Sequence, residues 1–509
     1  MFVTDLQNPG SVELISARSP SLLSSTPNGI SSIGFCPLST DGSLCVFSTD
    51  ADNVVANDTN GCRDVLVRDL IGDTNLLVSA NTNGNAGDKA SFDGAVSGDG
   101  RYVAFSSRAA DLIANDGNSA QDVFVRDLQT GTTILASMST NGTVGNGDSY
   151  LPHLNTDGRL VLFRSKASNL TRTPAGTPEN LCLRDLQLTT NYLLNANSDS
   201  LVCARMTIDG RYVVFGTSTS VNSYWYIWDT QLARRTYTNS VSGVANVAIS
   251  ASGERVAWAS ASGVFVKDVT LNILDTLSSG VAPANPGLSF SVDSRWLAYT
   301  RLTNNLNQVS LFDLVAKTNF LISCSWSNKL PASGHSDSPA MSGDGRFIAY
   351  RSFAADIVPG GTHGKTHVFV YDRQTDTTVL LSANVNATNA ANDHSVRPVF
   401  SADSQWLAFE TWSSDLVTGD FNGNPDVVLW HLFSSNSIPV FALRIASASA
   451  PTVLTWPARA GVNYKVQFKD QLGDGNWSDL PASVTIIGNQ AYCSDPAGVP
   501  RRFYRVAAF

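Results

Sequence analysis

Three short loops of this chain carry oxygen-bearing side chains at the same spacing. Oxygen ligands at positions 1, 3 and 7 of a glycine-containing loop could converge on a hard cation such as calcium. The residues are Asp58, Asn60 and Asp64, then Asp116, Asn118 and Asp122, and finally Asp420, Asn422 and Asp426. The full calcium-loop consensus with its distant bidentate Glu is absent. Because Asp and Asn also close turns by bonding their own backbone, structural turns are the favoured alternative to calcium.

Histidines provide a second candidate site. Four of the six lie in loops late in the chain, and they are His335, His363, His367 and His394. Asp337 and Asp393 are close to two of them in sequence and could orient the imidazole rings. Such a group would suit a transition metal or acid–base chemistry. Independent surface histidines are the favoured alternative, since sequence does not say whether these loops meet.

No residue stands out as a nucleophile. The chain has no Gly-x-Ser-x-Gly elbow, no His-Glu-x-x-His helix and no phosphate-binding glycine loop. Many Asp residues occupy the loops, so a carboxylate pair of the glycosidase kind stays open, although no two are distinguished. The sequence therefore assigns no catalytic residue.

A repeat determines how these loops are held. An Asp-Gly-type turn recurs eight times, at intervals of 41 to 59 residues, and an aromatic residue follows five positions after its second member. The turns begin at Asp41, Asp99, Asp157, Asp209, Ser252, Asp293, Asp344 and Asp403, and the aromatics are Phe47, Phe105, Phe163, Phe215, Trp258, Tyr299, Tyr350 and Phe409. A repeat of this length indicates one four-stranded propeller blade per unit.

The second unit defines the four strands, called A to D from the axis outward. Strand B is expected at 101–107, C at 122–128 and D at 132–137, with a strand A near 150–154 leading into the next turn. Strand C ends in a recurring Asp, namely Asp5, Asp69, Asp127, Asp185, Asp229, Asp268, Asp313 and Asp372. We expect these Asp residues to cap turns, and the aromatics to pack between neighbouring blades.

Two segments resemble the TolB-like propeller repeats, which are relatives of the WD-repeat propellers. They are Ser-x-Asp-Gly-Arg-Tyr-Val-Ala-Phe-Ser-Ser at 97–107 and Asp-Val-Phe-Val-Arg-Asp-Leu at 122–128. The resemblance implies an all-β fold with a TolB-like β-propeller over 1–437, and the eight turns imply eight blades. Seven blades are the alternative if the short unit near Val244 does not complete its sheet. The resemblance also implies a place in the cell envelope, periplasmic or extracellular.

The stretch 438–509 drops the repeat and contains short strand-like segments. Leu454-Thr-Trp-Pro, Tyr464-Lys-Val-Gln, Asn476-Trp-Ser-Asp-Leu and Arg502-Phe-Tyr-Arg-Val look like the fibronectin type III-like modules that end many large secreted bacterial proteins. Spacing of this kind predicts a small β-sandwich after the propeller. The resemblance implies no enzymatic activity for this module.

Composition narrows the function classes. The formal net charge of −9 disfavours nucleic acid as a partner, because no basic stripe is present to neutralise phosphates. The seven cysteines are scattered without a Cys-x-x-Cys pair, so we expect buried thiols, with a Cys36–Cys45 pairing across the first turn as the alternative. No apolar run has the roughly 20 residues of a transmembrane helix.

The beginning of the chain leaves two explanations open. Residues 1–7 read like the middle of a repeat unit, and no signal peptide precedes them. Either the N-terminal strands complete the last blade, or upstream sequence is missing.

The strand order decides where function is expected. In a blade that runs A-B-C-D, the tight A–B and C–D turns share one face, and the long B–C loops and D–A connections share the other, the top face. We therefore expect a non-catalytic binding or scaffold protein, a monomer, whose top face takes a protein, peptide or glycan. The alternative is a hydrolase or lyase with its active site over the propeller channel.

Overall fold

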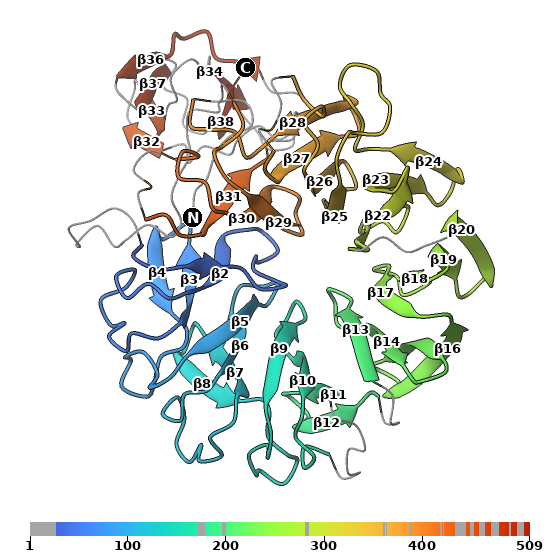
Figure 1. Cartoon of the computed structure of the whole chain (residues 1–509). Helices are drawn as coiled ribbons and strands as arrows, with labels where there is room; N and C mark the ends of the chain where they lie inside the picture. Colours follow the sequence, from blue (N-terminus) through green and yellow to red (C-terminus); the bar gives the residue numbers. More distant parts are fainter. Residues whose placement is uncertain are drawn as a thin grey trace. The chain divides into compact units, whose positions relative to one another are not determined.

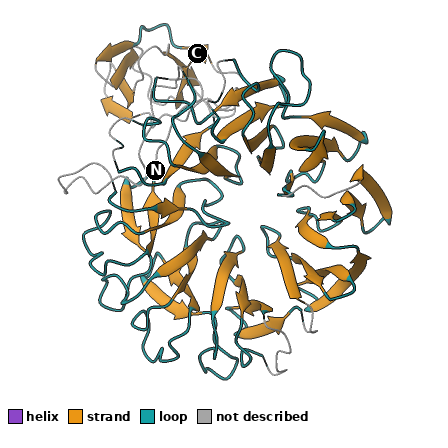
Figure 2. Cartoon of the chain, viewed as in Figure 1, coloured by secondary structure: helices purple, strands orange, loops and turns teal. Residues whose placement is uncertain are grey.

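Eight small antiparallel sheets are arranged in a ring around a central opening (Figure 1). The computed structural model describes residues 27–171, 179–195, 200–279, 285–359, 362, 364–386, 389–417, 420 and 422–432, and shorter stretches between 444 and 508. Every regular element in these residues is a strand, and loops connect them (Figure 2). No described helix has the length and apolarity that crossing a membrane requires.

The first four sheets each contain four strands, ordered as they follow in the sequence. Blade 1 holds β1 (Ser31–Ser32), β2 (Leu44–Thr49), β3 (Asp64–Asp69) and β4 (Thr74–Leu77). Blade 2 holds β5 (Ser91–Val96), β6 (Tyr102–Ser107), β7 (Asp122–Asp127) and β8 (Thr132–Leu135). Blade 3 holds β9 (Ser149–Leu154), β10 (Leu160–Ser165), β11 (Asn180–Asp185) and β12 (Thr190–Leu193), and blade 4 holds β13 (Ser200–Met206), β14 (Tyr212–Ser218), β15 (Ser223–Asp229) and β16 (Arg234–Val241).

The other four sheets complete the ring. Blade 5 holds β17 (Val244–Ile249), β18 (Arg255–Ser260), β19 (Gly263–Asp268) and β20 (Ile273–Ser279), and blade 6 holds β21 (Leu288–Phe290), β22 (Trp296–Thr303), β23 (Leu306–Asp313) and β24 (Thr318–Leu321). Blade 7 holds β25 (Ser336–Met341), β26 (Phe347–Ser352), β27 (His367–Asp372) and β28 (Thr377–Leu380). In blade 8 the described strands are β29 (Ser395–Phe400), β30 (Trp406–Thr411) and β31 (Asp426–His431).

The blade count is therefore eight. The seven-bladed alternative is wrong, because the short unit that begins near Val244 forms a complete four-stranded sheet. The two explanations for residues 1–7 concern a segment outside the described residues.

The Asp-Gly turns join strands A and B through a fixed hydrogen-bond pattern. In blade 2 the Asp99 carboxylate accepts the Arg101 amide (3.0 Å) and the Ser97 hydroxyl (2.5 Å). Gly100 has a φ of 76°, which a side chain would disfavour. The Ser97 oxygen also accepts the Tyr102 amide (2.9 Å) and so fixes where strand B begins. This explains the recurrence of Ser-x-Asp-Gly.

The Asp at the end of strand C caps the C–D turn, as predicted. Asp127 accepts the backbone amides of Gln129 (2.9 Å) and Thr130 (3.3 Å). It also pairs with Arg101, the residue after the A–B turn (2.7 Å). The same arginine–aspartate pair recurs at 2.6–2.8 Å as Arg159–Asp185, Arg211–Asp229, Arg295–Asp313 and Arg346–Asp372. Each pair connects the A–B turn of a blade to its C–D turn. These turns lie on the face opposite the top face, which is the bottom face.

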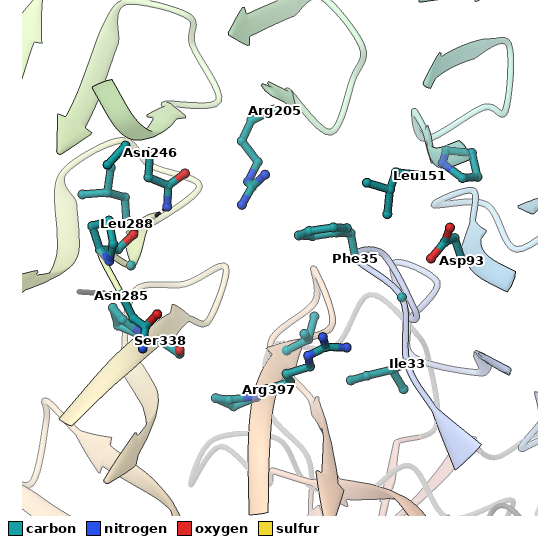
Figure 3. Close-up of a pocket in the computed structure, with 18 residues that line it drawn as sticks. Ile33, Phe35, Asp93, Leu151, Arg205, Asn246, Asn285, Leu288, Ser338 and Arg397 are labelled. Carbon is teal, nitrogen blue, oxygen red and sulfur yellow. Dashed lines mark hydrogen bonds between the residues drawn. The ribbon is translucent and has the colours of Figure 1, made fainter. Parts of the chain in front are cut away.

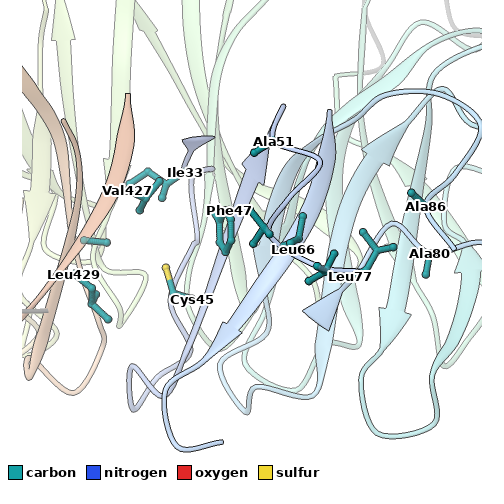
Figure 4. Packing of buried hydrophobic residues seen from close by; sticks show 13 residues of the cluster. Ile33, Cys45, Phe47, Ala51, Leu66, Leu77, Ala80, Ala86, Val427 and Leu429 are labelled. Carbon is teal, nitrogen blue, oxygen red and sulfur yellow. The ribbon is translucent and has the colours of Figure 1, made fainter. Parts of the chain in front are cut away.

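The aromatic of strand B packs against the preceding blade, which confirms its predicted role. Phe47 is fully buried with Ala408, Val427 and Leu429 of blade 8, and Figure 4 shows Phe47 on one strand and Val427 and Leu429 on a strand of the neighbouring blade. The other seven aromatics each share a cluster with residues of the blade before them, and all are at most 4% exposed. Burial of one large ring per interface holds neighbouring blades together.

Blades 8 and 1, which are not consecutive in sequence, are also joined by hydrogen bonds. The Ile33 amide donates to the carboxylate of Glu410 in β30 (2.9 Å). The Ser31 amide donates to the carbonyl of Pro425, directly before β31 (2.8 Å). Together with the Phe47 cluster, these bonds close the ring.

The chain divides into two compact units, Met1–Leu432 and Phe433–Phe509. In the second unit β32 (Arg444–Ser447), β33 (Thr452–Pro457), β37 (Gln490–Asp495) and β36 (Thr485–Ile487) form one sheet. β35 (Ser478–Asp479), β34 (Tyr464–Lys469) and β38 (Phe503–Ala508) form another.

Candidate binding cavity

Bulges interrupt the innermost strands of several blades. The pairing of β5, β9, β25 and β29 with the next strand shifts register in the middle of each strand. At each shift one non-glycine residue has a positive φ, between 52° and 57°, and these residues are Asp93, Leu151, Ser338 and Arg397. Such backbone is costly for L-residues, and bulges of this kind re-aim side chains beside functional sites.

These bulged residues line a cavity of about 520 Å³ on the propeller axis (Figure 3). Phe35 of blade 1 and Arg205 of blade 4 also contribute to its wall. A second space of about 250 Å³ lies nearer the bottom face, because Thr40, Gly98 and Thr156 of the A–B turns line it. The larger cavity therefore lies in the part of the channel towards the top face, and its volume is typical of small-ligand sites.

Arg205 brings a positive charge into this cavity. Its guanidinium donates to the Ala204 carbonyl (2.9 Å) and lies over the Phe35 ring, 5.1 Å from the centroid. Figure 3 shows the side chain extending into the space between the blades. Within the described residues Arg205 makes no ion pair with a carboxylate. Burial lowers the pKa of Arg205, yet an arginine stays charged, so the site favours an anion.

A second arginine and one carboxylate face the same space. Arg397 pairs with the buried Glu410 at 3.3 Å, while its own side chain is 65% exposed to the cavity and solvent. Asp93 accepts the Ser106 hydroxyl (3.1 Å). Burial raises the pKa of Asp93, and the Ser106 hydrogen bond and the charge of Arg397 partly oppose this rise. The wall is thus a mixture of two cations, one carboxylate, neutral polar side chains such as Asn246 and Asn285, and apolar groups.

A cysteine and a histidine meet beneath Phe35 without forming a reactive pair. The Cys36 sulfur lies 3.6 Å from His153 Nδ1. Burial raises the pKa of the Cys36 thiol to about 11 and lowers the pKa of His153 to about 3. Both groups are therefore neutral near pH 7, whereas a nucleophilic cysteine needs a lowered thiol pKa. All seven cysteines are free, so Cys36 and Cys45 form no disulfide.

The three predicted cation loops lie in the B–C connections of blades 1, 2 and 8. In each, the Asn oxygen accepts a backbone amide two residues on, and its amide group donates to the last Asp: Asn60 to Asp64 (2.7 Å), Asn118 to Asp122 (2.6 Å) and Asn422 to Asp426 (3.2 Å). The asparagines therefore shape the turn. The first carboxylates, Asp58, Asp116 and Asp420, are all buried.

The three described members of the predicted histidine group each have hydrogen-bond partners. His335 and His394 lie in D–A connections and accept the amides of Asn307 (3.1 Å) and Thr366 (3.0 Å) in the previous blade. His367 is buried in β27 between Ser382 and the Thr362 carbonyl. His363 lies outside the described residues, so the four-histidine site stays a prediction. Among the residues described, no three His, Cys, Asp or Glu side chains are grouped to hold a metal.

Sequence reasoning missed the residues that line the cavity. It looked for function in loops, whereas Asp93, Leu151, Ser338 and Arg397 belong to strands. One signal was present: Gly94, Pro152, Pro339 and Pro398 each follow such a residue and precede a turn Asp by five positions. Proline inside an apparent strand indicates a bulge. The fixed distance of these residues from the turn Asp could therefore have identified the residues that line the cavity.

Comparisons with known proteins add little to this description. No family model matches the chain, and no curated protein matches its sequence. Among solved structures the chain is similar to the crystal structure of TolB from Acinetobacter baumannii, at 12% identity and a TM-score of 0.33. The match covers 61% of this chain and 75% of that one. The eight sheets themselves, and not this similarity, establish the propeller.

Proposed function

We propose that the protein is a non-catalytic binding protein whose central cavity takes an acidic segment of a peptide or protein. The observation that carries the proposal is Arg205. A half-buried guanidinium with no carboxylate partner among the described residues gains most from a ligand that supplies one. Arg397 lies on the opposite wall and pairs with the buried Glu410, while most of its side chain stays exposed to the cavity and solvent.

The remaining wall favours a peptide over a small inorganic anion. Phe35 is 52% exposed and offers an apolar face beside Arg205. Leu151 and Leu288 line the cavity from other blades. Mixed apolar and charged walls of this kind suit a side chain that carries both a hydrocarbon part and a carboxylate.

An enzyme remains the second candidate because of one observation. Asp93 is a cavity carboxylate whose pKa burial raises, as a general acid requires. Its test is an Asp93→Asn variant assayed with wild-type protein on arrays of chromogenic glycoside and peptide substrates. Turnover that disappears with this substitution would favour the enzyme over the binding protein.

Selection from a random-peptide library on immobilised protein tests the binding proposal. We expect enrichment of peptides rich in Asp and Glu, and at least about a tenfold weaker binding of the selected peptides to Arg205→Gln, since a charge-assisted bond contributes about 1.5–3 kcal/mol. Arg234→Gln is the matched control, because Arg234 is an exposed arginine on the outer strand β16. The proposal is wrong if enrichment ignores charge, or if both variants bind as wild type does.

The predicted location of the protein and its predicted C-terminal module belong to the same proposal. A place in the periplasm or outside the cell, and a fibronectin type III-like sandwich that acts as a spacer or anchor in the second unit, suit a binding protein of the cell envelope. Fractionation of the native organism, followed by detection of the chain in envelope or medium, tests the location. Expression of 433–509 alone, with its own cooperative unfolding transition, tests the module.

A further inference from the structure

The B–C loop of blade 1 holds a carboxylate in an unfavourable place. Asp58 is only 4% exposed, and neither of its oxygens has a hydrogen-bond partner. A buried ionised carboxylate without partners is strongly unfavourable unless a proton or a cation neutralises it. The missing hydrogen-bond partners are an observation independent of the loop spacing. They indicate that Asp58 binds a ligand that the hydrogen bonds of the protein do not supply.

Asp64, the first residue of β3, is its neighbour and is completely buried. One Asp64 oxygen accepts the Ser79 hydroxyl (2.5 Å) and the other accepts the Asn60 amide group (2.7 Å). Each oxygen keeps one lone pair, since a carboxylate offers about four acceptor positions. Ser79 and Asn60 therefore hold Asp64 in place without using up its capacity to bind.

Positive side chains do not neutralise this pair. Within the described part of the chain, neither Asp58 nor Asp64 makes an ion pair, and the adjacent Arg63 is engaged with Asp50 (2.7 Å). Asp64 and Asp52 bring further negative charge close to Asp58. Two carboxylates held together in this way need either a shared proton or a cation.

We propose that the Asp58 and Asp64 carboxylates bind a divalent cation, with calcium as the expected ion. Carboxylate oxygens are hard ligands, and calcium accepts the irregular coordination of a loop more readily than magnesium does. Asn60 positions Asp64 and is not itself a ligand, because its oxygen accepts the Cys62 amide (2.7 Å).

The same arrangement recurs in two more blades. Asp122 and Asp426 begin strand C there and are at most 1% exposed, and Asp116 and Asp420 are 9% and 4% exposed. Blade 1 is the strongest of the three similar sites, because Asp58 is the first carboxylate whose two oxygens are both buried without a hydrogen-bond partner.

Calorimetric titration of calcium into chelator-treated protein tests the proposal, with magnesium as the comparison ion. We expect at least one calcium ion bound per wild-type chain, and a melting temperature raised by about 2 °C or more at saturation. Asp58→Asn, which keeps the side-chain shape and removes the charge, should bind one ion fewer.

Asp73→Asn is the matched control, because Asp73 lies in the C–D turn of the same blade and its side chain is 71% exposed. It should keep the wild-type stoichiometry. If Asp58→Asn does not fold, the wild-type titration still decides. An absence of calcium binding and of any melting shift overturns the proposal in favour of a shared proton, and an unchanged stoichiometry in Asp58→Asn overturns the assignment to this loop.

Discussion

At the residue scale, the same amino acid has different roles at the two ends of a blade. Asp127 on the bottom face accepts two backbone amides and a guanidinium, whereas Asp58 on the top face accepts nothing. Full hydrogen bonding makes the first a structural cap. Its absence makes the second a candidate ligand.

Acid titration should reveal the bottom-face pairs. The Arg101 hydrogen bond holds the pKa of Asp127 at about 2, below its ordinary value of 3.8. The stability that this carboxylate contributes is therefore present above about pH 4 and is lost as the pH falls through about 2. We expect Asp127→Asn to melt about 1–2 °C below wild type at pH 7, and this gap to narrow by pH 3 in scanning calorimetry.

Arg101→Gln provides the reciprocal measurement for this pair. Its gap to wild type should narrow over the same pH window, because the two substitutions remove one interaction from opposite sides. A gap that stays constant from pH 7 to pH 3 in either variant would mean that the pair does not contribute to stability.

At the element scale, the aromatic position of strand B carries a hydroxyl group in two of the blades. Tyr299 and Tyr350 replace the phenylalanine that most blades carry in strand B, and both rings are fully buried. The Tyr299 hydroxyl donates to the side-chain oxygen of Asn319 (2.8 Å). The Tyr350 hydroxyl is buried without a hydrogen-bond partner. Blades 6 and 7 therefore bury the same kind of ring. Its hydroxyl is hydrogen-bonded in blade 6 and has no partner in blade 7.

Paired substitutions separate ring packing from hydroxyl bonding. We expect Tyr299→Phe to lower the free energy of unfolding by about 1 kcal/mol, because it removes the hydrogen bond that the buried Tyr299 hydroxyl donates. Tyr350→Phe should be neutral or stabilising by up to about 1 kcal/mol, since it removes an unpaired buried hydroxyl. Urea unfolding of both variants checks the difference, and Tyr350→Ala, with an expected loss of about 3–5 kcal/mol, confirms that the ring itself matters. Equal losses in the two Phe variants would contradict this account.

At the scale of the whole molecule, ring closure depends on contacts between blades distant in sequence. Glu410 receives the Ile33 amide and touches Arg397, so it links the closure to the cavity wall. On the bottom face the Asp403 amide donates to the Thr40 carbonyl (2.9 Å), again joining blade 8 to blade 1. The contacts between blade 8 and blade 1 form the seam of the ring. Both the stability of the ring and the shape of the cavity therefore depend on this seam.

Substitution of Glu410 tests that coupling. We expect Glu410→Ala to lower the free energy of unfolding by about 1–3 kcal/mol, because it leaves the buried Ile33 amide without an acceptor. Glu410→Gln keeps a side-chain oxygen and should cost less. Urea unfolding measures both, and equal losses would show that the hydrogen bond does not hold the seam.

The repeat alone determined the architecture. Regular Asp-Gly turns and strand-B aromatics predicted the propeller, the buried rings and the capping role of Asp127, because each depends on neighbours close in sequence or on a register that every unit shares. The count of eight followed from the turns, although only the complete sheet of blade 5 excluded seven.

Tertiary structure alone decided the site. Arg205, Arg397 and Phe35 come from three blades and meet only when the ring closes, so no local pattern relates them. Missing hydrogen-bond partners likewise separate Asp58 from the other loop carboxylates, which are equally buried, and a missing partner depends on everything packed around the group. Local propensity specifies a blade, whereas the cavity and its charge arise from how eight blades surround one axis.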